Sequence, residues 1–516
     1  MEAKMADCHY DFIIIGTGAG GGTLAYKLAS SGKKILILER GNFLPKEKAN
    51  WDTKQVSQKE HYRTSEVWYD KNGQAIYPLT HYFVGGNTKF YGGALFRLRE
   101  RDFDQVIHQD GISPAWPLSY QDFAPYYDEA EKIYEVHGQR GLDPTEPPTN
   151  LDYPFPAISH EPYIKEIKYS LKNLDLHPFY LPIAIKLNEL NRYLSKCIRC
   201  NTCDGFPCLV DAKGDADING IRRAIAANNL KLITDAKVIK LHTSASGREV
   251  TGVEAEISGK RQIFSGHIVI VACGAINSAA LLLQSANDQH PNGLANSSNL
   301  VGRYYMSHNF GVVMSLSKKP HYTSFPKTLG VNDFYWGEKD FAYPMGSIQS
   351  LGNVNKDKIA AYGPPLMPKI LAEKLARHSI AWLVMTEDLP SYNNRVTWKN
   401  DTIYLEYKSN NQTAFNRLIK RWVEVLKSLQ VYQEGNCAIH IPQKMGVREV
   451  GHQCGTCRFG EDPQTSVLDI NCRTHDCDNL YVVDGSFFPS SAAVNPSLTI
   501  IANALRVGEH LLDRMK

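Results

Sequence analysis

Short apolar runs separated by glycines and polar stretches predict an α/β protein. Asp11–Ile15 and Lys34–Leu38 are typical of buried strands, and Thr23–Ser30 between them favours a helix. The same rhythm returns in the middle and at the end of the chain. Further strands are predicted at 230–234, 236–241, 249–255, 261–265, 267–274 and 480–485, and further helices at 275–285 and 496–511.

The remaining sequence has a different pattern. Residues 101–195 are rich in aromatics and prolines and predict loops and short helices, while 311–440 contain separate strand-like stretches. The pattern of residues 414–429 predicts an amphipathic helix with its apolar side chains on one face. We therefore predict a discontinuous, Rossmann-like nucleotide-binding domain and an inserted α+β substrate-binding domain with an antiparallel sheet. The first takes residues 1–104, 195–310 and 445–516, and the second takes 105–194 and 311–444.

A glycine fingerprint follows the first strand directly. Gly16, Gly18 and Gly21 have the G-x-G-x-x-G spacing, a helix follows, and Glu39 ends the second strand. In such units the glycines allow a tight turn, close approach of a pyrophosphate and helix packing, and the acid binds ribose hydroxyls. The order of these parts predicts a dinucleotide site but leaves NAD, NADP and FAD open.

Charge and composition narrow the possible partners. The 516 residues carry a net charge of +3, too small to indicate nucleic acid. No apolar run is long enough to span a bilayer. The first strand begins so early that no secretory signal fits before it, so we expect a cytoplasmic protein.

Eleven cysteines are present, and four of them are grouped. Cys197, Cys200, Cys203 and Cys208 have the spacing C-x2-C-x2-C-x4-C, which suits a zinc or iron–sulfur site as well as a compact structural turn. We favour the structural turn and keep the metal as the alternative. Cys454 and Cys457 could join this group in space, and Cys472 and Cys477 are expected in a surface loop. Cys8, Cys273 and Cys437 are expected to be small core residues or inert thiols.

Beyond these patterns, the chain resembles the glucose–methanol–choline (GMC) family of flavin oxidoreductases over nearly its whole length. The resemblance rests on Val84–Thr88, Val271–Ser278, Val301–His308, Gly451–Gly460, Val482–Ser486 and Ala492–Thr499, together with the glycine fingerprint. The pairing of His452 with Asn495 looks most like the pyranose oxidase and cholesterol oxidase branches. Asn201–Cys208 and Val84–Arg97 are most similar to bacterial sugar and glycoside 3-oxidases, which share this fragment without a metal.

The resemblance implies that His452 is the catalytic base and Asn495 its partner. Alcohol oxidation removes a hydroxyl proton and a hydride, so a histidine that titrates near neutral pH suits the first task and a neutral amide can hold the oxygen. His308 and His440 are expected to be structural or to line the pocket. Trp382, Tyr392 and Trp422 are candidates for the substrate pocket, although core packing is the favoured interpretation for each.

The family correspondence also predicts the cofactor contacts. They are Gly16, Gly18, Ala19, Gly20, Gly21, Glu39, Arg40, Gly85, Gly86, Asn87, Thr88, Val238, Cys273, Gly274, Asp484, Gly485, Pro496 and Ser497. Some relatives attach the flavin through a histidine shortly after the glycine pair. Phe90 falls at that position here, so the resemblance implies noncovalent FAD.

The resulting prediction is an FAD-dependent oxidation of an alcohol, a sugar or glycoside hydroxyl in the first instance. The alternatives are a sterol or lipophilic alcohol oxidase of the same fold, a light-driven decarboxylase, and an electron-transfer dehydrogenase subunit that carries an iron–sulfur cluster. The decarboxylase would need no His–Asn pair. Oxygen and another electron acceptor both remain open, as does the oligomeric state.

Overall fold

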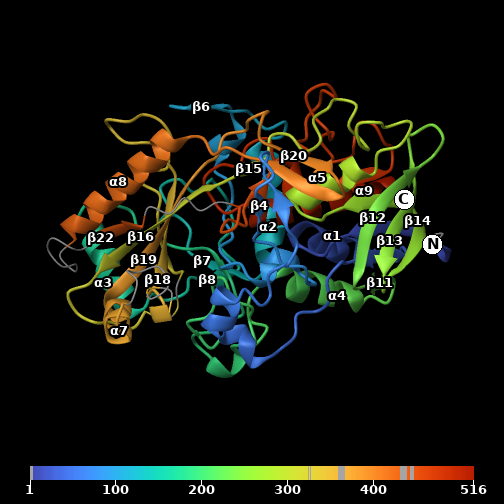
Figure 1. Ribbon diagram of the computed structural model, residues 1–516. Helices are drawn as coiled ribbons and strands as arrows, with labels where there is room; N and C mark the ends of the chain where they lie inside the picture. The colour runs from blue at the N-terminus through green and yellow to red at the C-terminus, as the bar shows by residue number, and fades with distance from the viewer. Residues whose placement is uncertain are drawn as a thin grey trace.

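The computed structural model describes residues 4–357 apart from 324 and 326, residue 359, and residues 367–429, 438–441 and 447–516. Two large sheets lie on opposite sides of the molecule, joined by loops and short helices (Figure 1). The predicted α/β class is confirmed, with a Rossmann-like sheet and a separate antiparallel sheet. Of the described helices, none combines the length and the apolar character needed to cross a bilayer.

The first sheet is assembled from three separate parts of the chain. Its order is β11 (Leu230–Ile233), β2 (Ile35–Leu38), β1 (Lys4–Ile15), β14 (Lys260–Val271), β13 (Val250–Ile257) and β12 (Ala236–Thr243), and β24 (Leu480–Val482) pairs with β14. The strands from β11 to β14, and β24 on β14, are parallel, whereas β12, β13 and β14 form antiparallel pairs. Helices cover the parallel part, which explains why these strands are apolar almost throughout.

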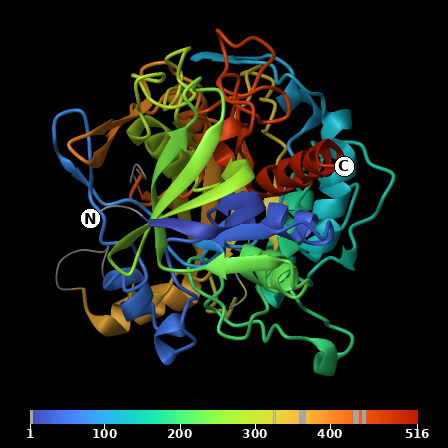
Figure 2. The ribbon, with the colours of Figure 1, turned by 90° about the vertical axis from the view of Figure 1, so that its right-hand side faces the viewer.

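Helices pack against this sheet where its strands end. α1 (Ala19–Ala29) follows β1, α5 (Ala275–Gln284) follows β14, and α9 (Ser497–Arg514) lies alongside α1 (Figure 2). The first of these begins at Ala19 rather than at the predicted Thr23. Its first turn contains glycines because it lies close to other backbone: a Cβ on Gly20 would lie 1.8 Å from the carbonyl oxygen of Val483, the residue directly after β24.

The second sheet is antiparallel throughout. Its order is β22 (Ala438–Ile441), β16 (Asn309–Leu316), β19 (Ser379–Thr386), β18 (Ser347–Gly352), β17 (Leu329–Val331) and β9 (Phe179–Tyr180). α8 (Gln412–Ser428) covers its outer face (Figure 1). The predicted amphipathic helix is therefore present, two residues earlier at its start.

Side chains alternate along these strands between the two faces of the sheet. Val313, Trp382 and Val384 point to the outer face and join the core beneath α8, whereas Phe310 and Leu383 point to the other face. Trp382 and Trp422 meet edge to face with ring centroids 4.9 Å apart in that core. Both tryptophans belong to the core and neither lines the cavity, in agreement with the interpretation favoured from the sequence. Tyr392 is a correction, because it is 44% exposed and lies against Arg303 at the surface instead of in a core.

Smaller α-helices and strands make up part of the remaining described chain. They are α2 (Tyr120–Ile133), α3 (Pro162–Lys172), α4 (Arg222–Ile225), α7 (Lys369–His378), the sheet β20 (Arg395–Lys399), β21 (Thr402–Glu406), β3 (Trp68–Tyr69) and β4 (Ala75–Ile76), the sheet β10 (Ile183–Ala184), β7 (Val136–Gly138) and β8 (Phe155–Pro156), and the pairs β5 (Val106–His108) with β6 (Gly111–Ser113) and β15 (Met306–Ser307) with β23 (Gln453–Cys454).

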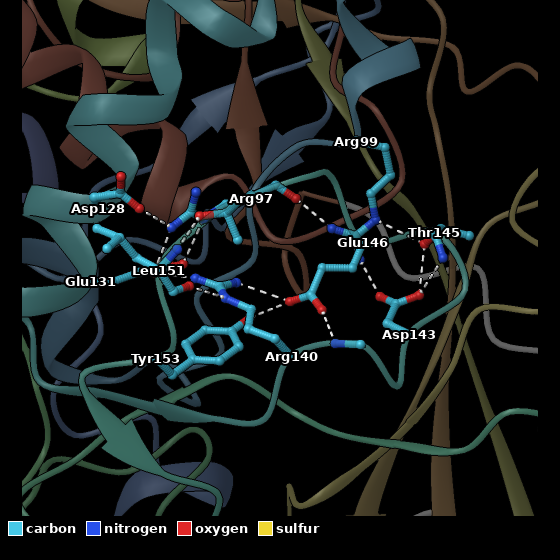
Figure 3. A network of polar contacts seen from close by, with 12 residues as sticks. Arg97, Arg99, Asp128, Glu131, Arg140, Asp143, Thr145, Glu146, Leu151 and Tyr153 are labelled. Atoms are coloured by element: carbon cyan, nitrogen blue, oxygen red, sulfur yellow. Dashed lines mark hydrogen bonds and ion pairs between the residues drawn. The ribbon is translucent and has the colours of Figure 1, made fainter.

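A buried ionic network fixes the segment that follows the second glycine pair (Figure 3). Arg97 donates to Glu131 and Asp128 of α2, and Arg140 donates to Glu131 and Glu146. Arg99 binds Asp143 at 2.7 Å. Each arginine is paired, so the cost of burying its charge is offset. The network anchors the chain directly after Gly92 and Gly93, which border the cavity described next.

Candidate active site

A cavity of about 660 Å³ lies between the two sheets. It is lined by the loop after β1, the ends of β2, β14 and β24, and the inner face of the second sheet. Its lining includes Gly16, Gly18, Ala19, Gly20, Glu39, Arg40, Gly86, Asn87, Thr88, Val238, Cys273, Gly274, Asp484, Gly485, Pro496 and Ser497, together with His452 and Asn495. The structure thus gathers predicted residues from the whole length of the chain.

Two predicted cofactor residues do not line the cavity. A Cβ on Gly21 would lie 2.1 Å from the carbonyl oxygen of Gly16, so this glycine serves the packing of α1 on β1. Gly85 has φ +97°, a conformation that glycine adopts freely, and its N–H donates to Thr17 Oγ1 at 3.0 Å. Both glycines therefore support the lining of the cavity from behind and do not themselves form its surface.

Two of the glycines that line the cavity, Gly18 and Gly274, leave room beside the backbone. A Cβ on Gly18 would meet nothing within 4 Å, and the same holds for Gly274, which has φ +89°. Gly18 caps α1 without a side-chain hydrogen bond, so the first N–H groups of the helix face the cavity. This open cradle at a helix N-terminus fits a pyrophosphate.

Acidic side chains close the nucleotide end. Glu39 is 6% exposed and accepts from the N–H groups of Thr17 at 3.0 Å and Gly41 at 2.9 Å. Burial raises the pKa of Glu39, and these hydrogen bonds oppose that rise. Arg40 pairs with Glu66 at 3.3 Å and lies over the ring of Tyr82. Asp484 accepts from the N–H of Gly274 at 2.9 Å and of Ser486 at 2.8 Å, which ties the ends of β14 and β24 together.

These observations fit FAD. The cradle at Gly18 and Gly274 has space that a Cβ would fill, and a carboxylate lies at the end of β2 where ribose hydroxyls are bound in such folds. The same cavity continues from there to His452. Phe90, which also lines it, stacks on His81 with ring centroids 3.8 Å apart.

At the opposite end three segments bring polar side chains together. β15 pairs with β23, with Ser307 opposite Gln453, so the next residues outward, His308 and His452, become neighbours. Their Nδ1 atoms are 3.0 Å apart. Nε2 of His452 lies 3.4 Å from Nδ2 of Asn495, which precedes α9.

Sequence reasoning did not single out Gln349. Its Nε2 donates to Oδ1 of Asn495 at 2.8 Å, which turns the Asn495 Nδ2 group toward His452. Gln349 stands opposite Leu383 in the sheet and therefore on the inner face. No local motif marks it, because only the strand register places it there.

The electrostatics favour a neutral base. Burial, then the neighbouring His308, then Lys327 hold the pKa of His452 well below its ordinary value. His452 is therefore neutral at pH 7 and able to accept a proton. Lys327 itself is paired with Asp204 at 2.9 Å, and both line the cavity beside Phe310, Leu351 and Leu383.

The grouped cysteines lie near this end. Gly205 donates its N–H to the carbonyl oxygen of Phe90 at 2.9 Å, so their loop packs against the cavity wall. Burial raises the pKa of Cys197 to about 11 and of Cys203 to about 12, and both are free thiols. In the part of the chain that the structure describes, no three His, Cys, Asp or Glu side chains are placed to hold a metal ion.

The other cysteines include one error of prediction. Cys472 and Cys477 are buried rather than on a surface loop. Asn503 of α9 donates to Cys472, and the thiol of Cys477 donates to the carbonyl oxygen of Gly247. Cys454 and Cys457 are buried, Cys8 is exposed, and Cys437 lies outside the described residues. The side chain of His440 is likewise outside them.

Comparison with known proteins agrees with this architecture. The profiles of the GMC oxidoreductases match residues 10–310 and 396–504. The chain is 29% identical to 6'''-hydroxyparomomycin C oxidase of Streptomyces lividus, covering 100% of this chain and 93% of that protein. It is 28% identical to 2-methyl-1,2-propanediol dehydrogenase of Mycolicibacterium austroafricanum, covering 98% and 95%.

The fold is also that of pyridoxine 4-oxidase from Mesorbium loti, with a TM-score of 0.70 at 16% identity over 97% of this chain and 99% of that one. The chain therefore belongs to the GMC oxidoreductase family and is an FAD-dependent oxidoreductase that acts on CH–OH groups.

Proposed function

We propose that this enzyme oxidises a hydroxyl group of a sugar or glycoside, with His452 as the base and Asn495 holding the substrate oxygen. The observation that carries the proposal is the convergence of His452 Nε2 and Asn495 Nδ2 at 3.4 Å on the cavity. A hydroxyl placed at these two atoms donates its proton to the imidazole and accepts a hydrogen bond from the amide. Bound FAD supplies the acceptor for the hydride.

The walls of the cavity support a polyhydroxylated substrate. Phe310, Leu351 and Leu383 offer an apolar surface for a ring face, and the Lys327–Asp204 pair offers charged hydrogen-bonding groups in the same cavity. A sterol would bury that ion pair without giving it partners, which is costly. Relatives named for a hydroxylated paromomycin and for a propanediol are consistent with this choice.

We also propose that FAD is held without a covalent bond. Phe90, a carbon side chain, occupies the position where some relatives carry a histidine, and it stacks on His81. Acid precipitation tests this: the flavin should stay in the supernatant, and flavin in the protein pellet would contradict it.

A substrate panel tests the proposed reaction. FAD-loaded enzyme under nitrogen is mixed with sugars, glycosides, a small diol and a sterol, and flavin bleaching is recorded. We expect bleaching with a sugar or glycoside at lower concentration than with the others. Bleaching by the sterol alone would overturn the substrate class. Reoxidation of the bleached enzyme by oxygen and by a quinone, compared in parallel, then identifies the electron acceptor.

A further inference from the structure

A second histidine lies behind His452. Nδ1 of His308 is 3.0 Å from Nδ1 of His452, and Nε2 of His308 is 3.1 Å and 2.9 Å from the carbonyl oxygens of Ser491 and Ala492. His308 is 2% exposed and does not line the cavity. It therefore acts on the reaction only through His452.

These contacts allow one arrangement of protons. Carbonyl oxygens only accept, so Nε2 of His308 carries a hydrogen. Burial lowers the pKa of His308, so the ring is neutral at pH 7 and its Nδ1 is an acceptor. Nδ1 of His452 must then donate to Nδ1 of His308. Nε2 of His452 consequently carries no hydrogen and faces Nδ2 of Asn495.

A buried carboxylate lies beyond the carbonyl groups. The N–H of Ala492 donates to Glu387 at 3.1 Å, and Glu387 also contacts His108 at 3.1 Å and accepts from Ser113 at 2.7 Å. Burial opposes ionisation of Glu387, but these partners outweigh it and its pKa is lowered. The carboxylate favours positive charge on His308.

Lys327 and Asp388 are further ionisable groups near the two histidines. Lys327 faces His452 and disfavours positive charge there. Asp388 accepts from the N–H of Ser307, and burial raises the pKa of Asp388 to about 7. Charge is thus better accommodated on the His308 side of the pair than on the His452 side.

We propose that His308 takes up the proton that His452 gives away during alcohol oxidation. As the substrate O–H proton moves to Nε2 of His452, the proton on Nδ1 of His452 moves to Nδ1 of His308. One N–H bond forms and one breaks on His452, so it stays neutral, and the positive charge rests between two carbonyl oxygens and toward Glu387. This step rests on the proposed role of His452 as the base.

Two variants separate proton uptake from simple positioning. In His308→Gln the amide oxygen can still accept from His452 and the NH₂ group can still donate to the carbonyls, but the side chain cannot take up a proton. In His308→Leu both properties are lost. Glu387→Gln keeps an acceptor for Ala492 and removes the charge.

The measurements are single-turnover flavin reduction under nitrogen, its proton inventory in H₂O–D₂O mixtures, and the ¹⁵N NMR tautomer of His452. General base catalysis supplies roughly 10²–10⁴-fold, so we expect His308→Gln to slow reduction by a smaller factor, roughly 10–100-fold. The His452 tautomer and the FAD content should be unchanged. The inventory should be curved in the unmodified enzyme and linear in His308→Gln. His308→Leu should be slower still, and Glu387→Gln less affected than either.

Reduction of His308→Gln at the unmodified rate, or a linear inventory in the unmodified enzyme, would overturn the relay. If the glutamine variant fails to bind FAD, the inventory and tautomer of the unmodified enzyme still decide. Failure of the proposed function is distinguishable, because then His452→Ala would also leave flavin reduction intact.

Discussion

The two ends of the cavity differ in what forms their surface, backbone at one end and side chains at the other. The nucleotide end consists mainly of backbone: Gly16, Gly18 and Gly20 form a surface that exists because side chains are missing. The catalytic end consists of side chains from segments far apart in sequence, with His308, Gln349, His452 and Asn495 in contact. One end depends on local chain geometry and the other on the register of two separate strand pairings.

This difference predicts distinct consequences of mutation. Changes at the nucleotide end should impair folding or weaken FAD binding. Changes at the catalytic end should leave a yellow, folded protein that reduces its flavin slowly.

The largest effect is expected from Gly20→Ala. Its Cβ would lie 1.8 Å from the carbonyl oxygen of Val483, so the backbone must shift, at a cost of about 1–3 kcal/mol or more. Gly18→Ala is the matched control, since its Cβ meets no protein atom within 4 Å. It should fold normally and bind FAD about tenfold more weakly, which corresponds to about 1.4 kcal/mol. Thermal unfolding and FAD titration measure both, and equal unfolding temperatures for the two variants would contradict the comparison.

Asn495→Ala should slow flavin reduction by roughly 10²-fold, because it removes a hydrogen-bond donor to the reacting oxygen. FAD content should not change. Rapid-mixing reduction under nitrogen measures the rate. An unchanged rate would show that Asn495 does not hold the substrate oxygen.

Gln349→Leu should have a smaller effect. It removes the bond that orients Asn495, and a hydrogen bond of this kind contributes about 0.5–1.5 kcal/mol, which is at most about tenfold in rate. Ile348→Val, which changes the other face of the same strand, is the control. If both variants reduce flavin equally fast, the orienting role is wrong.

The smallest effect is a shift in pH dependence. The base must be unprotonated, so the rate falls only when the pH drops below the pKa of His452, which is held well below its ordinary value. Lys327→Met removes a cation and therefore raises that pKa, so the acid limb of the reduction rate should move to higher pH. Lys399→Met, at a site outside the cavity, should leave the limb in place. If the acid limb of Lys327→Met lies at the same pH as in the unmodified enzyme, this electrostatic account is contradicted.

The same difference explains what the sequence could predict. The glycine fingerprint, Glu39 and the strands around them are contiguous, so local pattern was enough to place them. Gln349 and Lys327 carry no motif, and only the strand register brings Gln349 to Asn495. The sequence predicts His308 only as a structural or pocket-lining residue, because the pairing of β15 with β23 is what places it beside His452. The sequence predicts Cys472 and Cys477 in a surface loop, because nothing local shows that α9 packs on Cys472 or that Gly247 lies against Cys477. The sequence predicts a later start for α1 because glycines are poor helix formers, whereas close packing of Gly20 on Val483 requires glycine there.

The most direct test of the account is the FAD-loaded His452→Ala enzyme, mixed under nitrogen with the best substrate of the panel. The account predicts full FAD content and flavin reduction slowed by roughly 10²–10⁴-fold, the contribution expected of a general base. His290→Ala, a histidine outside the cavity, should reduce at the unmodified rate. Reduction of His452→Ala at the unmodified rate would contradict the central claim that the proton leaves the substrate through His452.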